Sequence, residues 1–165
     1  MGCTHPDARP GGTEGEIGKI GKADEATTEG SGTSAYTDSR EAAAYVAQTA
    51  VDVFAVSIGN THGFYQGDQH LEFGLLAESH AAIPVPLVLH GGTGISEKDI
   101  QRSIGLGIAK VNVASELVHT FRKILTRQWT EGRNLWAPLA IGESLPELER
   151  IASRWISIMG AEGKG

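Results

Sequence analysis

Residues 86–94 read Pro-Leu-Val-Leu-His-Gly-Gly-Thr-Gly, and this stretch decides the fold. Its apolar residues end in a histidine and a glycine cluster, which predicts a buried parallel strand that stops at a tight loop. Glycines let backbone N–H groups approach an anion closely. Ser96 and Asp99 follow with the spacing of a helix N-cap, so the loop leads to the positive end of a helix. The stretch therefore predicts a phosphate-sized anion site with His90 beside it.

Strand and helix patterns alternate along the rest of the chain. The predicted strands are 13–18, 53–58, 86–90 and 108–114, and the predicted helices are 42–47, 71–80, 96–106, 116–129 and a terminal amphipathic helix at 145–159. Such alternation predicts an α/β fold with a parallel sheet covered by helices. A complete eight-unit barrel takes about 250 residues, so four βα units here predict a partial TIM (β/α)8 barrel. A small open, doubly wound sheet is the alternative.

Composition places this chain among ordinary single-domain proteins. It has 165 residues, 40% of them hydrophobic, and a formal net charge of −6. Without a stretch rich in Lys and Arg, the acidic balance argues against a nucleic-acid partner. The single cysteine, Cys3, suits a reducing compartment, and no apolar run predicts a membrane span or signal peptide, so we expect a cytoplasmic protein. Residues 1–12 show no periodicity and are expected to be a disordered or foreign leader.

Polar side chains collect where the predicted strands end. Glu14 and Glu16 share one face of the first strand, because side chains alternate along a strand. His62 follows the second strand and His90 ends the third. Two histidines and a carboxylate suit Zn²⁺ with an open position for a substrate oxygen. The plainer interpretation is two satisfied polar histidines, and Glu14 either orients a metal ligand or is a buried, paired acid.

Four motifs follow one another along the chain: EGEIG at 14–18, GNTHGFY at 59–65, LHGGTG at 89–94 and KVNVASEL at 110–117. Together they closely resemble the zinc-dependent class II ketose-bisphosphate aldolases, the fructose- and tagatose-bisphosphate enzymes. The resemblance covers only the second half of that family's barrel. It implies that residues 13–165 are the C-terminal half of a class II aldolase-like barrel, with strands five to eight and a terminal helix.

The resemblance also implies site roles residue by residue. His62, His90 and Glu16 match the zinc-binding positions. Asp24 or Glu25 lies in register with the acidic loop residue that removes a proton from dihydroxyacetone phosphate. Positions that match the substrate phosphate and carbonyl contacts, with a monovalent cation (Na⁺ or K⁺) beside them, are Gly63, Gly91, Thr93, Asn112, Ala114 and Ser115.

The implied activity is that of an aldehyde-lyase of glycolysis and carbohydrate metabolism. It would reversibly cleave fructose or tagatose 1,6-bisphosphate to dihydroxyacetone phosphate and glyceraldehyde 3-phosphate. The family's first zinc histidine and its neighbouring aspartate lie on earlier strands, and residues 1–12 do not replace them. The sequence therefore leaves open whether the chain is an active enzyme, and we expect an impaired or inactive fragment from a truncated reading frame. The alternative is a non-catalytic half-barrel that binds sugar phosphate or needs a complementing N-terminal half.

A half-barrel has a second consequence, which concerns its edges. A closed barrel has no free strand, whereas four parallel strands leave the first and the last with unpaired backbone groups. Such edges pair readily with other strands. The sequence therefore predicts either a homo-oligomer that forms through its exposed sheet edges or a partly open, aggregation-prone domain.

Overall fold

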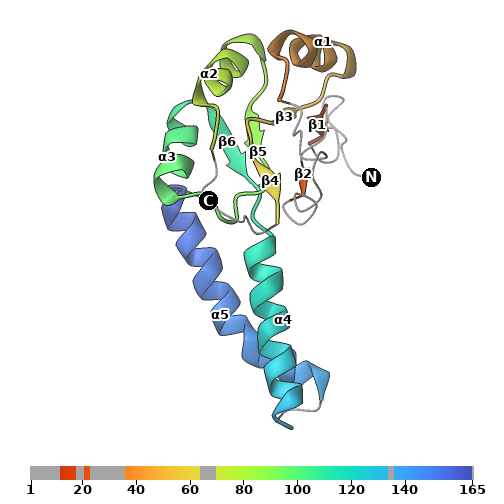
Figure 1. Cartoon of the computed structure of the whole chain (residues 1–165), viewed down its shortest axis with the longest axis vertical. Coiled ribbons are helices and arrows are strands. Elements are labelled where there is room, and N and C mark those ends of the chain that lie inside the picture. The colour runs from red at the N-terminus through yellow and green to blue at the C-terminus, as the bar shows by residue number, and fades with distance from the viewer. Residues whose placement is uncertain (1–11, 18–20, 23–35, 64–69, 134–135, 165) are drawn as a thin grey trace, which may run out of the picture.

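The computed structural model describes residues 12–17, 21–22, 36–63, 70–133 and 136–164 (Figure 1). Its strands are β1 (Glu14–Glu16), β2 (Gly21–Lys22), β3 (Val53–Val56), β4 (Thr61–His62), β5 (Leu87–Leu89) and β6 (Ile108–Val111). Its helices are α1 (Ser39–Thr49), α2 (Phe73–Ala82), α3 (Glu97–Gly105), α4 (Ser115–Thr130) and α5 (Ala137–Ile158). No helix in these ranges is both long and apolar enough to cross a membrane.

The main sheet has the strand order β1-β3-β5-β6, and every neighbouring pair is parallel. Helices α1, α2 and α3 connect its successive strands, as parallel pairing requires. This order confirms the predicted α/β fold with a parallel sheet and is consistent with part of a barrel. The numbering of these strands as five to eight of a barrel stays a prediction.

A second, two-stranded sheet was not expected. Gly21 and Lys22 form β2, which pairs in parallel with Thr61 and His62 of β4. The sequence-based prediction was a continuous loop from residue 21 to 35, because two residues carry no readable periodicity. The pairing matters because it gives His62 a strand position beside the main sheet (Figure 1).

Two predicted helix starts are confirmed by their caps. The Asp38 carboxylate accepts hydrogen bonds from the backbone N–H groups of Arg40 and Glu41, both at 2.9 Å, before α1. The Ser96 hydroxyl oxygen accepts one from the N–H of Asp99 at 3.1 Å before α3. Each cap satisfies N–H groups that the first helical turn leaves without partners.

The terminal helix begins earlier than predicted. It starts at Ala137 and not at Leu145, with Pro138 in its first turn and Pro146 inside it. A proline in the first turn costs nothing, because that N–H would have no helical partner. Proline inside a helix is unfavourable by propensity, but α5 lies alongside α4 for most of its length, and this packing overrides the local preference (Figure 1).

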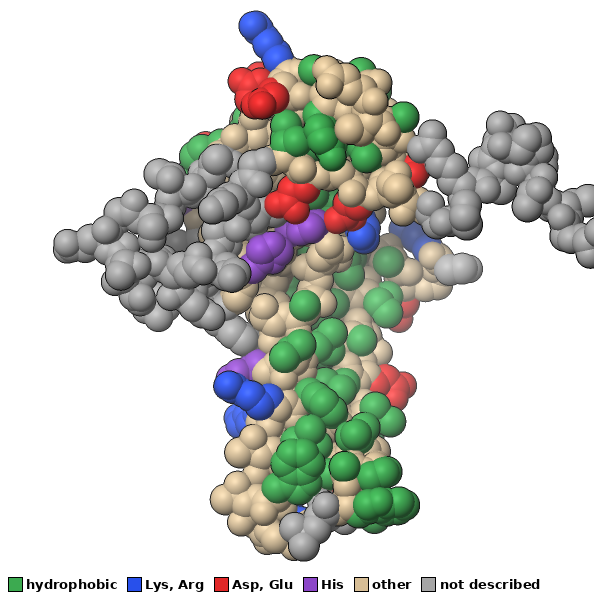
Figure 2. Space-filling model, turned by 90° about the vertical axis from the view of Figure 1, so that its right-hand side faces the viewer, with side chains coloured by type: hydrophobic (Ala, Val, Ile, Leu, Met, Phe, Trp, Pro, Cys, Tyr) green, Lys and Arg blue, Asp and Glu red, His purple; other side chains and the backbone are tan. Residues whose placement is uncertain are grey.

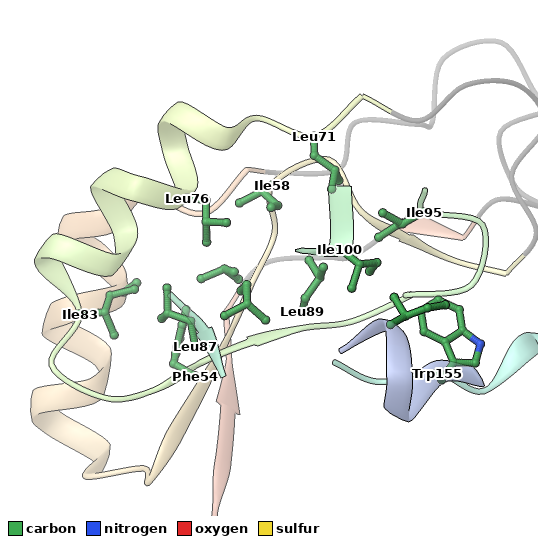
Figure 3. Close-up of a cluster of buried hydrophobic side chains, with 14 of the residues drawn as sticks. Phe54, Ile58, Leu71, Leu76, Ile83, Leu87, Leu89, Ile95, Ile100 and Trp155 are labelled. Atoms are coloured by element: carbon green, nitrogen blue, oxygen red, sulfur yellow. The ribbon is translucent and has the colours of Figure 1, made fainter. Parts of the chain in front are cut away.

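The hydrophobic core lies between the main sheet and its helices. Phe54 of β3 and Leu87 and Leu89 of β5 are fully buried, together with Leu76 of α2 and Ile100 of α3 (Figure 3). Helices α4 and α5 extend away from this core as an arm, along which hydrophobic side chains reach the surface (Figure 2). The end of α5 nearest the sheet joins the core through Ile151, Trp155 and Ile158 (Figure 3). The core therefore holds both the strand ends, where the predicted site lies, and the base of the arm.

Candidate metal and phosphate site

Glu14 and Glu16 point to the same face of β1, as predicted. The residue between them, Gly15, is buried against α1, and a Cβ atom there would lie 2.7 Å from Cε1 of Tyr45. Close packing of Gly15 on one face of the strand leaves both carboxylates on the other. This face is the one that His90 approaches from the end of β5.

The two predicted histidine ligands lie together. The ring centroids of His62 and His90 are 5.6 Å apart, with an interplanar angle of 63°. Nδ1 of His90 lies 3.9 Å from a carboxylate oxygen, Oε2, of Glu16. Within the described ranges, however, no three His, Cys, Asp or Glu side chains form a cluster that could hold a metal ion. The pairwise contacts are present, and the role of these residues as metal ligands stays a prediction.

Glu14 pairs with two partners at once. Its Oε1 lies 2.6 Å from Nε2 of His90, and its Oε2 accepts a hydrogen bond from Nζ of Lys110 at 2.6 Å. Burial raises the pKa of the Glu14 carboxyl, but the hydrogen bonds to Lys110 and His90 outweigh it and hold this pKa below its ordinary value. The carboxylate therefore stabilises the fold above the ordinary glutamate pKa, and this contribution is lost as the pH falls through the lowered value.

The hydrogen bond between Glu14 and Lys110 also indicates that the main sheet is curved. β1 and β6 are its outer strands, with two strands between them, so on a flat sheet they would lie about 14 Å apart. Two side chains that stand on a flat sheet could not meet over that distance. The sheet therefore curves toward the face that carries Glu14 and His90.

Asn60 holds the main chain of His90. Asn60 is fully buried; its Oδ1 accepts from the N–H of Ile58 at 2.9 Å, and its Nδ2 donates to the carbonyl oxygen of His90 at 3.1 Å. The sequence-based prediction gave no role to Asn60 or to Lys110. The available signal was a polar amide directly after a buried strand and its glycine, since a buried amide needs partners.

The loops after β5 and β6 are bonded to each other. The N–H of Gly92 donates to the carbonyl oxygen of Asn112 at 3.0 Å. The hydroxyl oxygen of buried Thr93 accepts from the N–H of Glu116, in the first turn of α4, at 3.2 Å. The structure therefore brings the predicted phosphate residues of these two loops together at the start of a helix.

The remaining predicted residues fall at the start of α4, directly after β4 and outside the described ranges. Ala114 is the N-cap residue of α4 and gives no cap hydrogen bond from its own side chain, and Ser115 is the first residue of the helix. The positive end of the helix dipole lies there, and of its first-turn N–H groups that of Glu116 already donates to Thr93. Gly63 follows β4 directly. Asp24 and Glu25 lie outside the described residues. The phosphate and proton-transfer roles of all these residues stay predictions.

The fold and this site define an α/β protein whose parallel strands carry a polar, histidine-containing site at their carboxyl ends. Residues 8–164 match the family described as Fructose-bisphosphate aldolase class-II, and the chain belongs to this family. The family expected from the four motifs is thereby confirmed.

Solved structures agree with this membership. The chain is similar to the YdjI aldolase from Escherichia coli K12, with 36% identity and a TM-score of 0.68 over 78% of this chain and 47% of that one. It is similar to a putative fructose-1,6-biphosphate aldolase from Coccidioides immitis, with 25% identity and a TM-score of 0.74 over 93% of this chain and 53% of that one.

A third structure shows the fold alone. Fructose-bisphosphate aldolase (Fba) from Campylobacter jejuni is 17% identical, with a TM-score of 0.59 over 76% of this chain and 45% of that one. The chain thus spans about half the length of each of these three aldolases.

Proposed function

We propose that this chain carries the metal-binding and phosphate-binding half of a class II aldolase that acts on fructose or tagatose 1,6-bisphosphate in the cytoplasm. The reaction is reversible aldol cleavage to dihydroxyacetone phosphate and glyceraldehyde 3-phosphate. The observation that carries the proposal is the approach of the His62 and His90 rings to 5.6 Å, at the carboxyl ends of parallel strands. Family membership supports it.

The donors suit zinc in type, and one pair of them also suits it in spacing. Imidazole nitrogen and carboxylate oxygen are ordinary zinc ligands, and two such atoms in a tetrahedral shell lie about 3.4 Å apart. Nδ1 of His90 and Oε2 of Glu16 are 3.9 Å apart, close to this value. We propose that His62, His90 and Glu16 hold the ion. When bound, zinc supplies Lewis-acid polarisation of the substrate C2 carbonyl and stabilises the enediolate charge.

We propose that side chains and backbone N–H groups of this chain remove the proton, bind the phosphate and contact the substrate carbonyl. We assign proton removal to Asp24 or Glu25, which lie outside the described residues. The N–H groups at the start of α4, with Ala114 and Ser115, suit a phosphate, and the Gly91 and Gly63 loops suit the same anion with a Na⁺ or K⁺ ion beside it. We assign to Asn112 the contact near the substrate carbonyl. The backbone carbonyl oxygen of Asn112 accepts a hydrogen bond from the N–H of Gly92, in the glycine loop after β5.

The second candidate is a half-barrel that binds sugar phosphate without turnover. One observation favours it: the described residues do not assemble three metal-ligating side chains, whereas catalytic zinc sites normally have three protein ligands. On this candidate the carbonyl is not polarised well enough for C–C cleavage. Binding of dihydroxyacetone phosphate would then survive, and cleavage would require an added N-terminal half.

Removal of either histidine should weaken zinc binding by the chain strongly. We expect the parent protein to bind zinc, and His62→Ala and His90→Ala each to lose more affinity than the roughly 10–100-fold typical of an outer-shell change. His119→Ala is the control, because His119 lies exposed on α4 in contact with Arg122. Competition with a chromophoric chelator measures the affinity. A parent protein that binds no zinc, or histidine variants with parental affinity, would overturn the proposal.

A cleavage assay separates the two candidates. Fructose 1,6-bisphosphate is incubated with the chain, with and without a chelator, and glyceraldehyde 3-phosphate is measured with a coupled enzyme. Chelator-sensitive cleavage by the chain alone would exclude the non-catalytic candidate. Binding of dihydroxyacetone phosphate without cleavage would support it.

We also propose self-association through the sheet. β1 and β6 are the outer strands of the main sheet, and each pairs on one side only within that sheet. Unpaired strand edges invite another strand. We expect light scattering after size-exclusion chromatography to report a mass above the 17.4 kDa of one chain. A well-folded monomer at micromolar concentration would contradict this.

A further inference from the structure

Glu14 is placed to orient the ring of His90. Its two carboxylate oxygens have different partners, Nε2 of His90 and Nζ of Lys110, each at 2.6 Å. An ionised carboxylate only accepts hydrogen bonds, so the proton in the contact with His90 is carried by Nε2. The bond to Lys110 keeps the carboxylate from turning away from the ring.

The other ring nitrogen of His90 faces a different acid. Nδ1 lies 3.9 Å from Oε2 of Glu16, which is too long for a hydrogen bond. The distance is close to the roughly 3.4 Å between two ligand atoms in a tetrahedral zinc shell. The two ring nitrogens are therefore divided between two carboxylates that lie on the same face of β1.

We propose that Glu14, held by Lys110, fixes His90 with its proton on Nε2 and thereby makes Nδ1 the metal-binding nitrogen, an inference that rests on the proposed zinc site. Metal-binding histidines generally donate their second ring N–H to an acceptor, which fixes the tautomer and the ring orientation. Asn60 holds the main-chain carbonyl of the same residue at 3.1 Å, so both ends of His90 are anchored. Glu14 is then a positioning residue, and Glu16 is left to approach the ion.

The tautomer can be measured on metal-free protein. Long-range proton–nitrogen correlation spectra of histidine-labelled protein distinguish the tautomers, and a His90→Gln sample assigns the signal among the six histidines. We expect the proton of His90 on Nε2 in the parent and loss of this preference in Glu14→Ala. Addition of NMR-active cadmium should split the signal of Nδ1. Splitting of Nε2, or a proton on Nδ1 in the parent, would overturn the proposal.

Zinc affinity gives the second measurement. We expect Glu14→Ala to bind zinc about 10–100-fold more weakly than the parent. Lys110→Met should lose less, because the acceptor for Nε2 remains, and Glu14→Gln should recover part of the loss for the same reason. Circular dichroism confirms that each variant is folded.

A matched control is available in the chain. Glu72 also pairs with a histidine, because its Oε1 lies 3.2 Å from Nε2 of His70, but both side chains are exposed. Glu72→Ala therefore removes a carboxylate–histidine pair outside the site and should leave zinc affinity within twofold. Parental affinity and an unchanged tautomer in Glu14→Ala would overturn the proposal.

Different results would overturn the proposed zinc site and the positioning role of Glu14. A parent chain that binds no zinc would overturn the proposed function and, with it, the metal role of Nδ1. The tautomer of metal-free His90 and its dependence on Glu14 decide the positioning role without any metal. A zinc-binding parent in which Glu14 has no influence would overturn this inference alone.

Discussion

Replacement of Phe54 with alanine is expected to lower the free energy of unfolding by about 3–5 kcal/mol. Phe54 is fully buried on β3, which has a neighbouring strand on each side in the main sheet. Its ring meets that of Tyr45 from α1 edge-on, with centroids 6.0 Å apart, and lies near Leu87 of β5 (Figure 3). The truncation would leave a cavity between the sheet and α1 that neither rigid neighbour can fill.

Urea unfolding followed by circular dichroism measures this change. Val118→Ala is the control, because Val118 is 65% exposed on α4 and should change stability by less than about 0.5 kcal/mol. If Phe54→Ala cost less than about 1 kcal/mol, the core would not lie where the structure places it. The free energy of unfolding of a protein is typically about 5–15 kcal/mol, so a loss of the predicted size would remove a large part of it.

Local sequence signals predicted the helices and buried strands of this fold well. Asp38 and Ser96 sit where short capping patterns predict helix starts, because a cap depends only on the next three residues. The start of α5 was predicted wrongly, since Pro146 is unfavourable locally and only packing against α4 explains the helix around it. β2 was missed because its pairing partner lies far away in the sequence.

The candidate site shows the same division between local and distant information. The proximity of His62 and His90 could be predicted, because parallel strands bring their carboxyl ends to one edge. The contact of Glu14 with Lys110 could not, since it depends on the curvature of a sheet whose outer strands carry the two residues. The backbone contact of Asn60 also depends on the fold, because Asn60 and His90 come from different loops.

Gly59→Ala is expected to cost about 2–4 kcal/mol of stability and to weaken zinc binding as well. Gly59 has φ of +103°, a conformation that residues with a Cβ atom rarely adopt. A Cβ atom there would also lie 2.5 Å from the backbone carbonyl oxygen of His70, which cannot move as a side chain could. The backbone around Gly59 must therefore shift, and Asn60 and His62, which follow closely along the chain, would shift with it.

Gly142→Ala is the matched control for this substitution. Gly142 lies inside α5 with nothing within 4 Å of an added Cβ atom, so alanine should stabilise the helix by about 0.5–1 kcal/mol. Urea unfolding and zinc competition are measured on both variants. Because Asn60 joins this loop to the carbonyl of His90, the same shift should move both histidines, and we expect zinc affinity to fall in Gly59→Ala only. Equal stability of the two variants would contradict the strained turn at Gly59. A destabilised Gly59→Ala with parental zinc affinity would show that this loop does not position the metal site.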